Sequence, residues 1–72
     1  MSLFEQLKVT RREVARRAGV FAYMIFSDST LLDMSRRRPA TVGQLLDVPG
    51  VGRLKAARYG SEFLKTIREY DG

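Results

Sequence analysis

Three basic side chains recur at a regular interval near the start of this sequence, and they are the first residues that could do chemistry. Lys8, Arg12 and Arg16 lie four residues apart, so on a helix they form one ridge along its outer face. The chain carries 13 Lys and Arg against 8 Asp and Glu, a net charge of +5. This balance makes the chain a candidate for binding a polyanionic partner, because cations release counterions from phosphates. The alternative is a solvated surface that binds nothing.

Further basic residues lie in the middle and last thirds of the chain. Arg36, Arg37 and Arg38 are consecutive, so they point in different directions and cannot all contact one ligand. At least one is expected to cap the helix that ends at these residues. The outer face of the last predicted helix is lined by Arg58, Lys65 and Arg68, with Ser61. The candidate nucleic-acid contacts here are Arg36, Arg37 and Arg58.

The strongest local motif is a glycine-containing turn between two predicted helices. The segment from Leu45 to Gly52 reads Leu-Leu-Asp-Val-Pro-Gly-Val-Gly, which resembles the helix-hairpin-helix motif of DNA-binding proteins. The glycines permit a tight turn, and free amides at the next helix start can point at a phosphate. We therefore expect backbone contacts to phosphate from Gly50, Val51 and Gly52, with added charge from Arg53 and Lys55. The alternative is a tight connection that contacts no ligand.

One aromatic residue, Tyr23, lies in an apolar segment that follows Gly19. Its position alone favours a place in the core, because exposed aromatic rings are uncommon. The alternative is an exposed ring at the bend beside basic residues, which could stack on an unpaired base.

Catalytic and metal chemistry have little support in this sequence. The chain has no Cys and no His, so it lacks the usual nitrogen and sulfur metal ligands and the commonest general base. Its carboxylates are scattered, and Glu13 and Glu62 have ion-pair spacing to Arg16, Arg17 and Arg58. No nucleophile lies beside a base, and no loop matches a nucleotide-binding motif. The sequence therefore predicts no enzyme, no cofactor, no small-molecule substrate and, lacking a long apolar run, no membrane span.

The elements that position these residues are predicted to be helices. Apolar residues at helical spacing predict a first helix from about Leu3 to Ala18, with Gly19 as its C-cap. The uniformly apolar segment 20–26 predicts a buried connector with one irregular turn. Asp28 is the expected N-cap of a second helix with a buried face of Leu31, Leu32 and Met34. That helix should end at the three arginines, before Pro39.

Two more helices are predicted in the second half. Thr41 and Gln44 form a capping box at the start of a short helix, whose apolar side is Leu45, Leu46 and Val48. The last helix is expected to run from near Gly52 to about Glu69. Gly60 lies within it, which indicates close approach of another helix, or alternatively a local break with Ser61 as a new cap. The sequence predicts a single all-α domain over residues 1–72, with 1–2 not native to the protein and 70–72 frayed.

Taken together, the pattern resembles the HRDC domain (helicase and RNase D C-terminal) over Leu3 to Ile67. The order and spacing of the following residues carry this resemblance: Leu7, Arg11, Val20, Tyr23-Met24-Ile25-Phe26, Asp28-Ser29-Thr30-Leu31, Met34, Pro39, Leu45-Leu46, Val48-Pro49-Gly50-Val51-Gly52, Lys55, Tyr59-Gly60, Phe63 and Ile67. The Tyr-x-x-Phe-x-Asp-x-Thr-Leu stretch and the Gly-Val-Gly-x-x-Lys turn are similar to the RecQ branch. Phe21-Ala22 stands where family members usually have Pro-Pro.

The resemblance implies a small five-helix, SAM-like bundle without catalytic residues. It implies binding to single-stranded or partially duplex DNA, and an accessory role beside the core of an ATP-dependent DNA helicase in the same chain. It also implies that Tyr23 contributes to single-strand binding, which favours the exposed ring. The alternative is a docking module that regulates the helicase core, or a partner protein, by charge complementarity. We expect a cytoplasmic place near the bacterial nucleoid, or another intracellular one.

Overall fold

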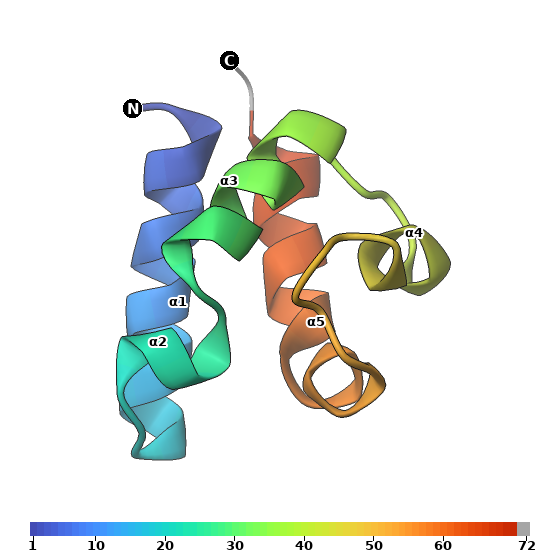
Figure 1. Cartoon of the computed structure of the whole chain (residues 1–72). Coiled ribbons are helices and arrows are strands. Elements are labelled where there is room, and N and C mark those ends of the chain that lie inside the picture. Colours follow the sequence, from blue (N-terminus) through green and yellow to red (C-terminus); the bar gives the residue numbers. More distant parts are fainter. Residues whose placement is uncertain (71–72) are drawn as a thin grey trace.

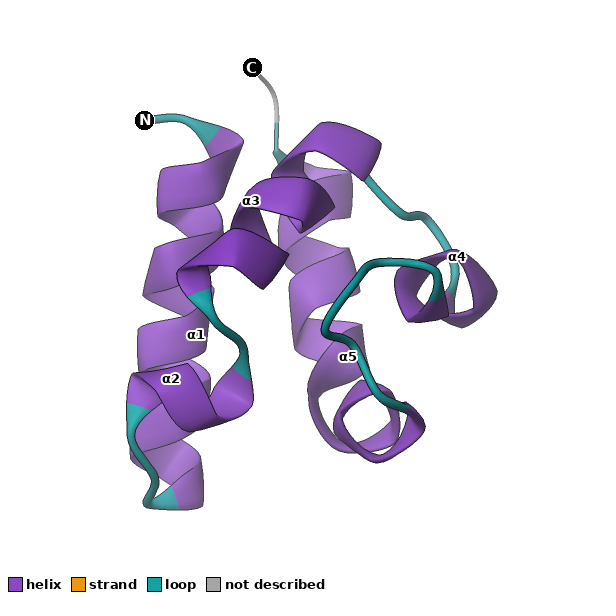
Figure 2. Cartoon of the chain, in the orientation of Figure 1, coloured by secondary structure: helices purple, strands orange, loops and turns teal. Residues whose placement is uncertain are grey.

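The computed structural model describes residues 1–70, and all the regular structure in that range is helical (Figures 1 and 2). The prediction of an all-α, five-helix domain is confirmed. The helices are α1 (Leu3–Ala18), α2 (Ala22–Ile25), α3 (Asp28–Arg37), α4 (Val42–Leu46) and α5 (Arg53–Glu69).

The two long helices, α1 and α5, run antiparallel and form the frame of the domain (Figure 1). The hydroxyls of Thr10, in the middle of α1, and Thr66, in the last turn of α5, join them and are 2.6 Å apart. At one end Tyr70 donates from its hydroxyl to the carbonyl of Met1, at 3.3 Å. The short helices α2 and α3 pack on α1, and α4 packs on α5. The end of α1, α2 and the start of α5 therefore share the end of the domain opposite the two termini (Figure 1).

The core lies between these helices and is almost wholly apolar. Phe26 and Phe63 meet edge to face at its centre, with ring centroids 5.0 Å apart. Gly60 is buried in the middle of α5, and a Cβ there would lie 3.0 Å from Leu45 Cδ2. The prediction that this glycine permits close helix approach is confirmed. The alternative of a break in the last helix is wrong, because α5 continues unbroken through Gly60.

The helix caps agree with the sequence predictions at some ends and differ at others. Gly19 closes α1 in the left-handed conformation, at φ 72°. The predicted N-cap Asp28 is wrong by one residue: Ser27 has the extended cap geometry, and its hydroxyl accepts from the Thr30 amide. Asp28 is then the first helical residue, which leaves its carboxylate to pair with another helix.

The capping box predicted for α4 is only half formed. The Thr41 hydroxyl accepts from the amide of Gln44 at 3.1 Å, as expected. The Gln44 side chain, however, accepts from the Ala40 amide at 2.8 Å and does not bond to Thr41. The reason is geometric: the chain before α4 brings the Ala40 amide within reach of this side chain.

The connector between α1 and α3 is not the buried irregular segment that the sequence predicts. It contains the short helix α2, and only its last two residues, Ile25 and Phe26, are buried. Phe21, Tyr23 and Met24 are exposed, since a four-residue helix lying on α1 has one inner face and one outer face. For the same reason Leu32 and Leu46, which were expected in the core, lie on the outer sides of α3 and α4.

The ends of the described chain take part in the fold. Ser2 forms a capping box with Glu5 at the start of α1. The prediction of fraying falls partly on Tyr70, which packs against the core, and partly on residues 71–72, which lie outside the described range. Within residues 1–70 no helix combines the length and apolarity needed to cross a membrane.

Candidate nucleic-acid interface

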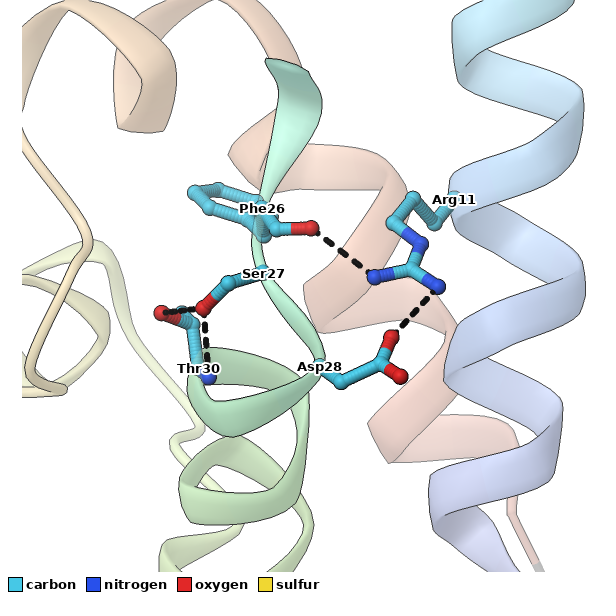
Figure 3. A network of polar contacts seen from close by, with 5 residues as sticks. All are labelled: Arg11, Phe26, Ser27, Asp28 and Thr30. Atoms are coloured by element: carbon cyan, nitrogen blue, oxygen red, sulfur yellow. Dashed lines mark hydrogen bonds and ion pairs between the residues drawn. The ribbon is translucent and has the colours of Figure 1, made fainter. Parts of the chain in front are cut away.

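A half-buried arginine anchors the segment that carries Tyr23. The Arg11 side chain is only 13% exposed; its Nη1 donates to the Phe26 carbonyl at 2.9 Å, and its Nη2 lies 2.7 Å from Asp28 Oδ1 (Figure 3). The guanidinium therefore spans the joint between α2 and α3 from its place on α1. Since both contacts fall just after α2, they fix the short helix that presents Tyr23.

The same joint connects to the glycine turn through Thr30. The Ser27 and Thr30 hydroxyls are 3.0 Å apart (Figure 3). Thr30 is buried, and a Cβ added at Gly50 would overlap its Oγ1. Gly50 also has φ 91°, which favours glycine. The backbone at Gly50 therefore lies close against Thr30 of α3, and this contact is the reason that the position requires glycine.

The three backbone positions predicted to contact phosphate are not equivalent. The Val51 amide donates to the Val48 carbonyl at 3.1 Å, so in this structure it is committed within the turn. The turn closes on itself with this backbone hydrogen bond, so a phosphate contact from Val51 would require the bond to open, and that contact stays a prediction. Gly52, by contrast, is the exposed N-cap of α5, and the helix has no side-chain cap there. Gly50 is exposed at the turn.

The start of α5 carries positive charge where a helix usually carries negative charge. Arg53 is exposed, Lys55 is half-buried, and the first turn has no acidic residue. Cations at a helix N-terminus are unfavourable, because the uncapped amides already make that end positive. The first turn of α5 therefore combines uncapped amides and two cations without a local counter-charge.

Arg58, one turn further along α5, lies at the junction with α1. It lines a shallow hollow with Arg17, Tyr59 and Glu62, on a floor that includes Val14 and Ala18. The ion pairs predicted within each helix are not the ones formed. Arg17 pairs with Glu62 across the two helices, at 2.9 Å, because the antiparallel packing brings them together. The predicted pairing of Glu62 with Arg58, and of Glu13 with Arg16 or Arg17, is wrong for the described residues.

The ridge on α1 is present, but its three members differ. Arg12 and Arg16 are exposed on the outer side of the helix. Lys8 is half-buried, and its Nζ lies 4.8 Å from the centroid of the Phe4 ring. Because α1 rises about 1.5 Å per residue, Arg16 is nearest the α2 end of the domain and Lys8 is furthest from it.

Arg36 and Arg37 lie at the other end of the domain. The last turn of α3 is near the chain termini (Figure 1), and Arg38 lies 5.5 Å from the centroid of the Tyr70 ring. Arg37 Nη1 donates to the carbonyl of Asp47, the C-cap of α4. The expectation that one arginine of this run caps its own helix is confirmed, because Arg38 is the C-cap of α3 and its amide donates to the Met34 carbonyl. The structure does not bring Arg36 and Arg37 together with Tyr23.

Tyr23 itself is exposed, so the place in the core that its position alone favours is wrong, and the exposed ring that the family resemblance favours is observed. Its ring lies parallel to that of Phe21, with centroids 6.0 Å apart and an angle of 12° between the planes. Both rings are at the end of the domain that carries Arg16, Arg17, Arg53 and Arg58.

Two contributors to this end of the domain were missed by the sequence analysis. Phe21 was assigned to a buried segment, because seven consecutive apolar residues carry no signal that separates an exposed side from a buried one. Arg11 was quoted only as part of a family pattern; a basic residue four positions after Leu7 and four before Ala15 could have been recognised as facing the interior. In the described part of the chain, no three residues of the types that ligate metals come together.

The comparisons with known proteins establish the family. The family model of the HRDC domain matches residues 1–67, so the chain belongs to the HRDC domain family. A solved structure described as D. radiodurans RecQ HRDC domain 3 has a TM-score of 0.90 and 34% identity, and the match covers 93% of this chain and 88% of that one.

The similar full-length proteins are helicases. The ATP-dependent DNA helicase RecQ of Bacillus subtilis (strain 168) is 44% identical over 68 residues, which are 94% of this chain and 12% of the helicase. The ATP-dependent DNA helicase UvrD2 of Mycobacterium tuberculosis is 36% identical over 66 residues, which are 92% of this chain and 9% of that protein. The chain thus spans about a tenth of the length of these relatives.

Proposed function

We propose that this HRDC domain binds single-stranded or partially duplex DNA at the end of the domain formed by the last turns of α1, by α2 and by the first turns of α5. The observation that carries this proposal is the exposed Tyr23 ring at an end where cations outnumber carboxylates. Its DNA-contacting residues would be Tyr23, Arg16, Arg53, Lys55 and Arg58, with Arg12 and then Lys8 further along α1.

The ion pairs support this assignment, because they leave these cations available. Within residues 1–70 the arginines that form ion pairs are Arg11, with Asp28, and Arg17, with Glu62. An arginine without a carboxylate can neutralise a phosphate and release its counterion, whereas a paired one must first give up its partner. The uncapped amides at Gly52 and the adjacent residues add donors for the same phosphates.

Titration of the isolated domain with single-stranded, duplex and forked DNA at two salt concentrations tests the proposal. Affinity should fall steeply with added salt. Tyr23→Ala should weaken single-strand binding by about 1–3 kcal/mol. Val42→Ala removes part of an exposed apolar side chain on α4 and is the matched control. An affinity that does not change with salt concentration, or no binding at the lower salt concentration, would contradict DNA binding.

The parent chain is proposed to be an ATP-dependent DNA helicase of the RecQ type, acting inside the cell. In that setting the domain would tune which DNA structures the motor accepts. Deleting the domain from the full-length protein should then change the relative unwinding of forked and duplex substrates. Unchanged substrate preference after deletion would contradict this role.

Docking to the helicase core is the second candidate, and Arg36 and Arg37 favour it. They are exposed in the last turn of α3, which lies at the end of the domain away from α2 (Figure 1). Arginine pairs readily with carboxylates of a partner surface. Under this alternative, Arg36→Glu with Arg37→Glu alters helicase activity while the isolated domain binds DNA as before.

A further inference from the structure

Two large aromatic side chains at the start of α2 are stacked on one another and presented to solvent. Phe21 is 72% exposed and Tyr23 is 71% exposed. Their planes differ by only 12°, and their centroids are 6.0 Å apart. Apolar rings gathered at the surface of a small domain mark a binding surface more often than single scattered ones do.

The backbone explains why these rings meet. Residues two apart on a regular helix point in nearly opposite directions. Phe21, however, is the N-cap of α2 and has extended geometry, at φ −73° and ψ 150°. Its side chain therefore leaves the chain before the helical turn begins, and it reaches the same side as Tyr23. Arg11 holds the far end of this segment through the Phe26 carbonyl, so the pair is fixed to α1.

We propose that Phe21 and Tyr23 together form a stacking surface for unpaired bases, which makes Phe21 a DNA-contacting and specificity-determining residue. The inference rests on the proposed DNA binding and deepens it by naming the feature recognised: the face of a base that has no partner strand. The two rings are stacked, so a base can extend the stack on an outward ring face. Such stacking is tolerant of sequence because every base has a flat aromatic face.

The charges near the pair favour a nucleic acid over an apolar protein segment as the occupant. Arg16 and Arg17 are in the last turn of α1, immediately before the segment that carries the rings. No acidic residue occurs between Glu13 and Asp28. A strand with one base on the rings would thus have its phosphates next to cations. Bases in a duplex are already stacked, so this site selects single strands and unpaired ends.

Two probes of equal charge separate stacking from phosphate contact. One is a short oligo-dT strand, and the other is an abasic strand of the same length, with the same phosphates and no bases. The wild-type domain should bind oligo-dT more tightly than the abasic strand by about 5- to 150-fold, the range expected for one stacked base. Phe21→Leu keeps an apolar side chain without a ring, and Phe21→Tyr keeps a ring.

Phe21→Leu should lose about fivefold or more in affinity for oligo-dT and nothing for the abasic strand. Phe21→Tyr should bind both strands as the wild type does. Because Phe21 is largely exposed, its variants should unfold at the same temperature as the wild type, which circular dichroism checks. The chain has no Trp and three Tyr. With Tyr59→Phe and Tyr70→Phe, quenching of the remaining tyrosine emission by oligo-dT reports stacking on Tyr23 directly.

The outcomes separate this inference from the proposed function. If Phe21→Leu binds oligo-dT as tightly as the wild type while Tyr23→Ala binds weakly, the shared stacking surface is refuted and DNA binding stands. If the wild type binds neither strand, DNA binding itself fails and the inference fails with it. If both strands bind equally and the rings are instead protected by the helicase core in the full-length protein, the surface is a protein contact.

Discussion

Gly50→Ala tests how the glycine turn is built. Gly50 has φ 91°, and a Cβ there would overlap Thr30 Oγ1. Thr30 cannot move aside freely, because it is buried and its hydroxyl meets that of Ser27. Gly52 offers a matched control two residues later: it has φ −88°, and an added Cβ meets no atom within 4 Å.

The expected loss of unfolding free energy in Gly50→Ala has two parts. A non-glycine residue at this φ costs about 1–3 kcal/mol of strain. Forcing a methyl group against Thr30 adds about 1–3 kcal/mol. The sum is about 2–6 kcal/mol, against a total stability of about 4–10 kcal/mol for a domain of this size. At about 4–8 °C per kcal/mol, Gly50→Ala should lower Tm by about 10 °C or more. Gly52→Ala should cost at most about 1 kcal/mol.

Urea unfolding in two backgrounds separates the two parts. Thr30→Ala removes Oγ1 and Cγ2 and leaves only the Thr30 Cβ, 3.3 Å from the added methyl. In that background the cost of Gly50→Ala should fall by about 1–3 kcal/mol, because the overlap with Oγ1 is removed and the backbone strain and the closer Cβ contact remain. An equal cost in both backgrounds would refute the steric role of Thr30. A cost near zero in the wild-type background would refute the whole account of this turn.

Further substitutions test the packing around the candidate interface by urea or thermal unfolding. Arg11→Gln should destabilise the domain by about 1–3 kcal/mol, because a buried, charge-assisted contact is lost; Asp28→Asn should cost less than about 1 kcal/mol, because Asp28 is 70% exposed. Equal losses of stability in Arg11→Gln and Asp28→Asn would show that the ion pair with Asp28, and not the bond to the Phe26 carbonyl, is the main contribution of Arg11. Gly60→Ala should destabilise through its contact with Leu45, and in a Leu45→Val background it should instead stabilise by about 1 kcal/mol; destabilisation in both would contradict this reason. Ser27→Ala should cost about 1–2 kcal/mol as a lost N-cap, and an unchanged stability would argue against that cap.

The sequence predicted the helices correctly where the apolar spacing was regular and capping residues marked the ends. The first helix, its glycine cap, and the close packing at Gly60 follow from patterns that are local to one helix. The cap of α3 was misplaced because Ser27 and Asp28 are both competent caps. The position of Arg11 on α1 decides between them: Asp28 pairs with Arg11, and Ser27 caps α3.

The connector between α1 and α3 was misjudged for a different reason. Seven consecutive apolar residues show no periodicity, so the sequence cannot separate an inner from an outer side. The four-residue helix α2 creates those sides when it packs on α1. Exposure of Phe21 and Tyr23 is thus a consequence of tertiary contact, and the family resemblance favoured it only for Tyr23.

The candidate interface was predicted by residue type but not by location. Regular spacing identified Arg12 and Arg16 as exposed on one helix. It could not show that Arg36 and Arg37 lie at the opposite end of the domain from α2, since that depends on how α3 crosses the frame (Figure 1). Nor could regular spacing show that the Val51 amide donates to the Val48 carbonyl within its own turn.

The salt dependence of binding to a short single strand tests the central claim most directly. Each phosphate contact to single-stranded DNA contributes about −0.7 to the slope of log affinity against log salt concentration. Arg53→Gln with Arg58→Gln should therefore make the slope shallower by about 1.4. Arg36→Gln with Arg37→Gln, at the other end of the domain, should leave the slope unchanged. The same slope for the wild type and the Arg53 and Arg58 variant, or a larger change from Arg36 and Arg37, would contradict a DNA interface at the α2 end.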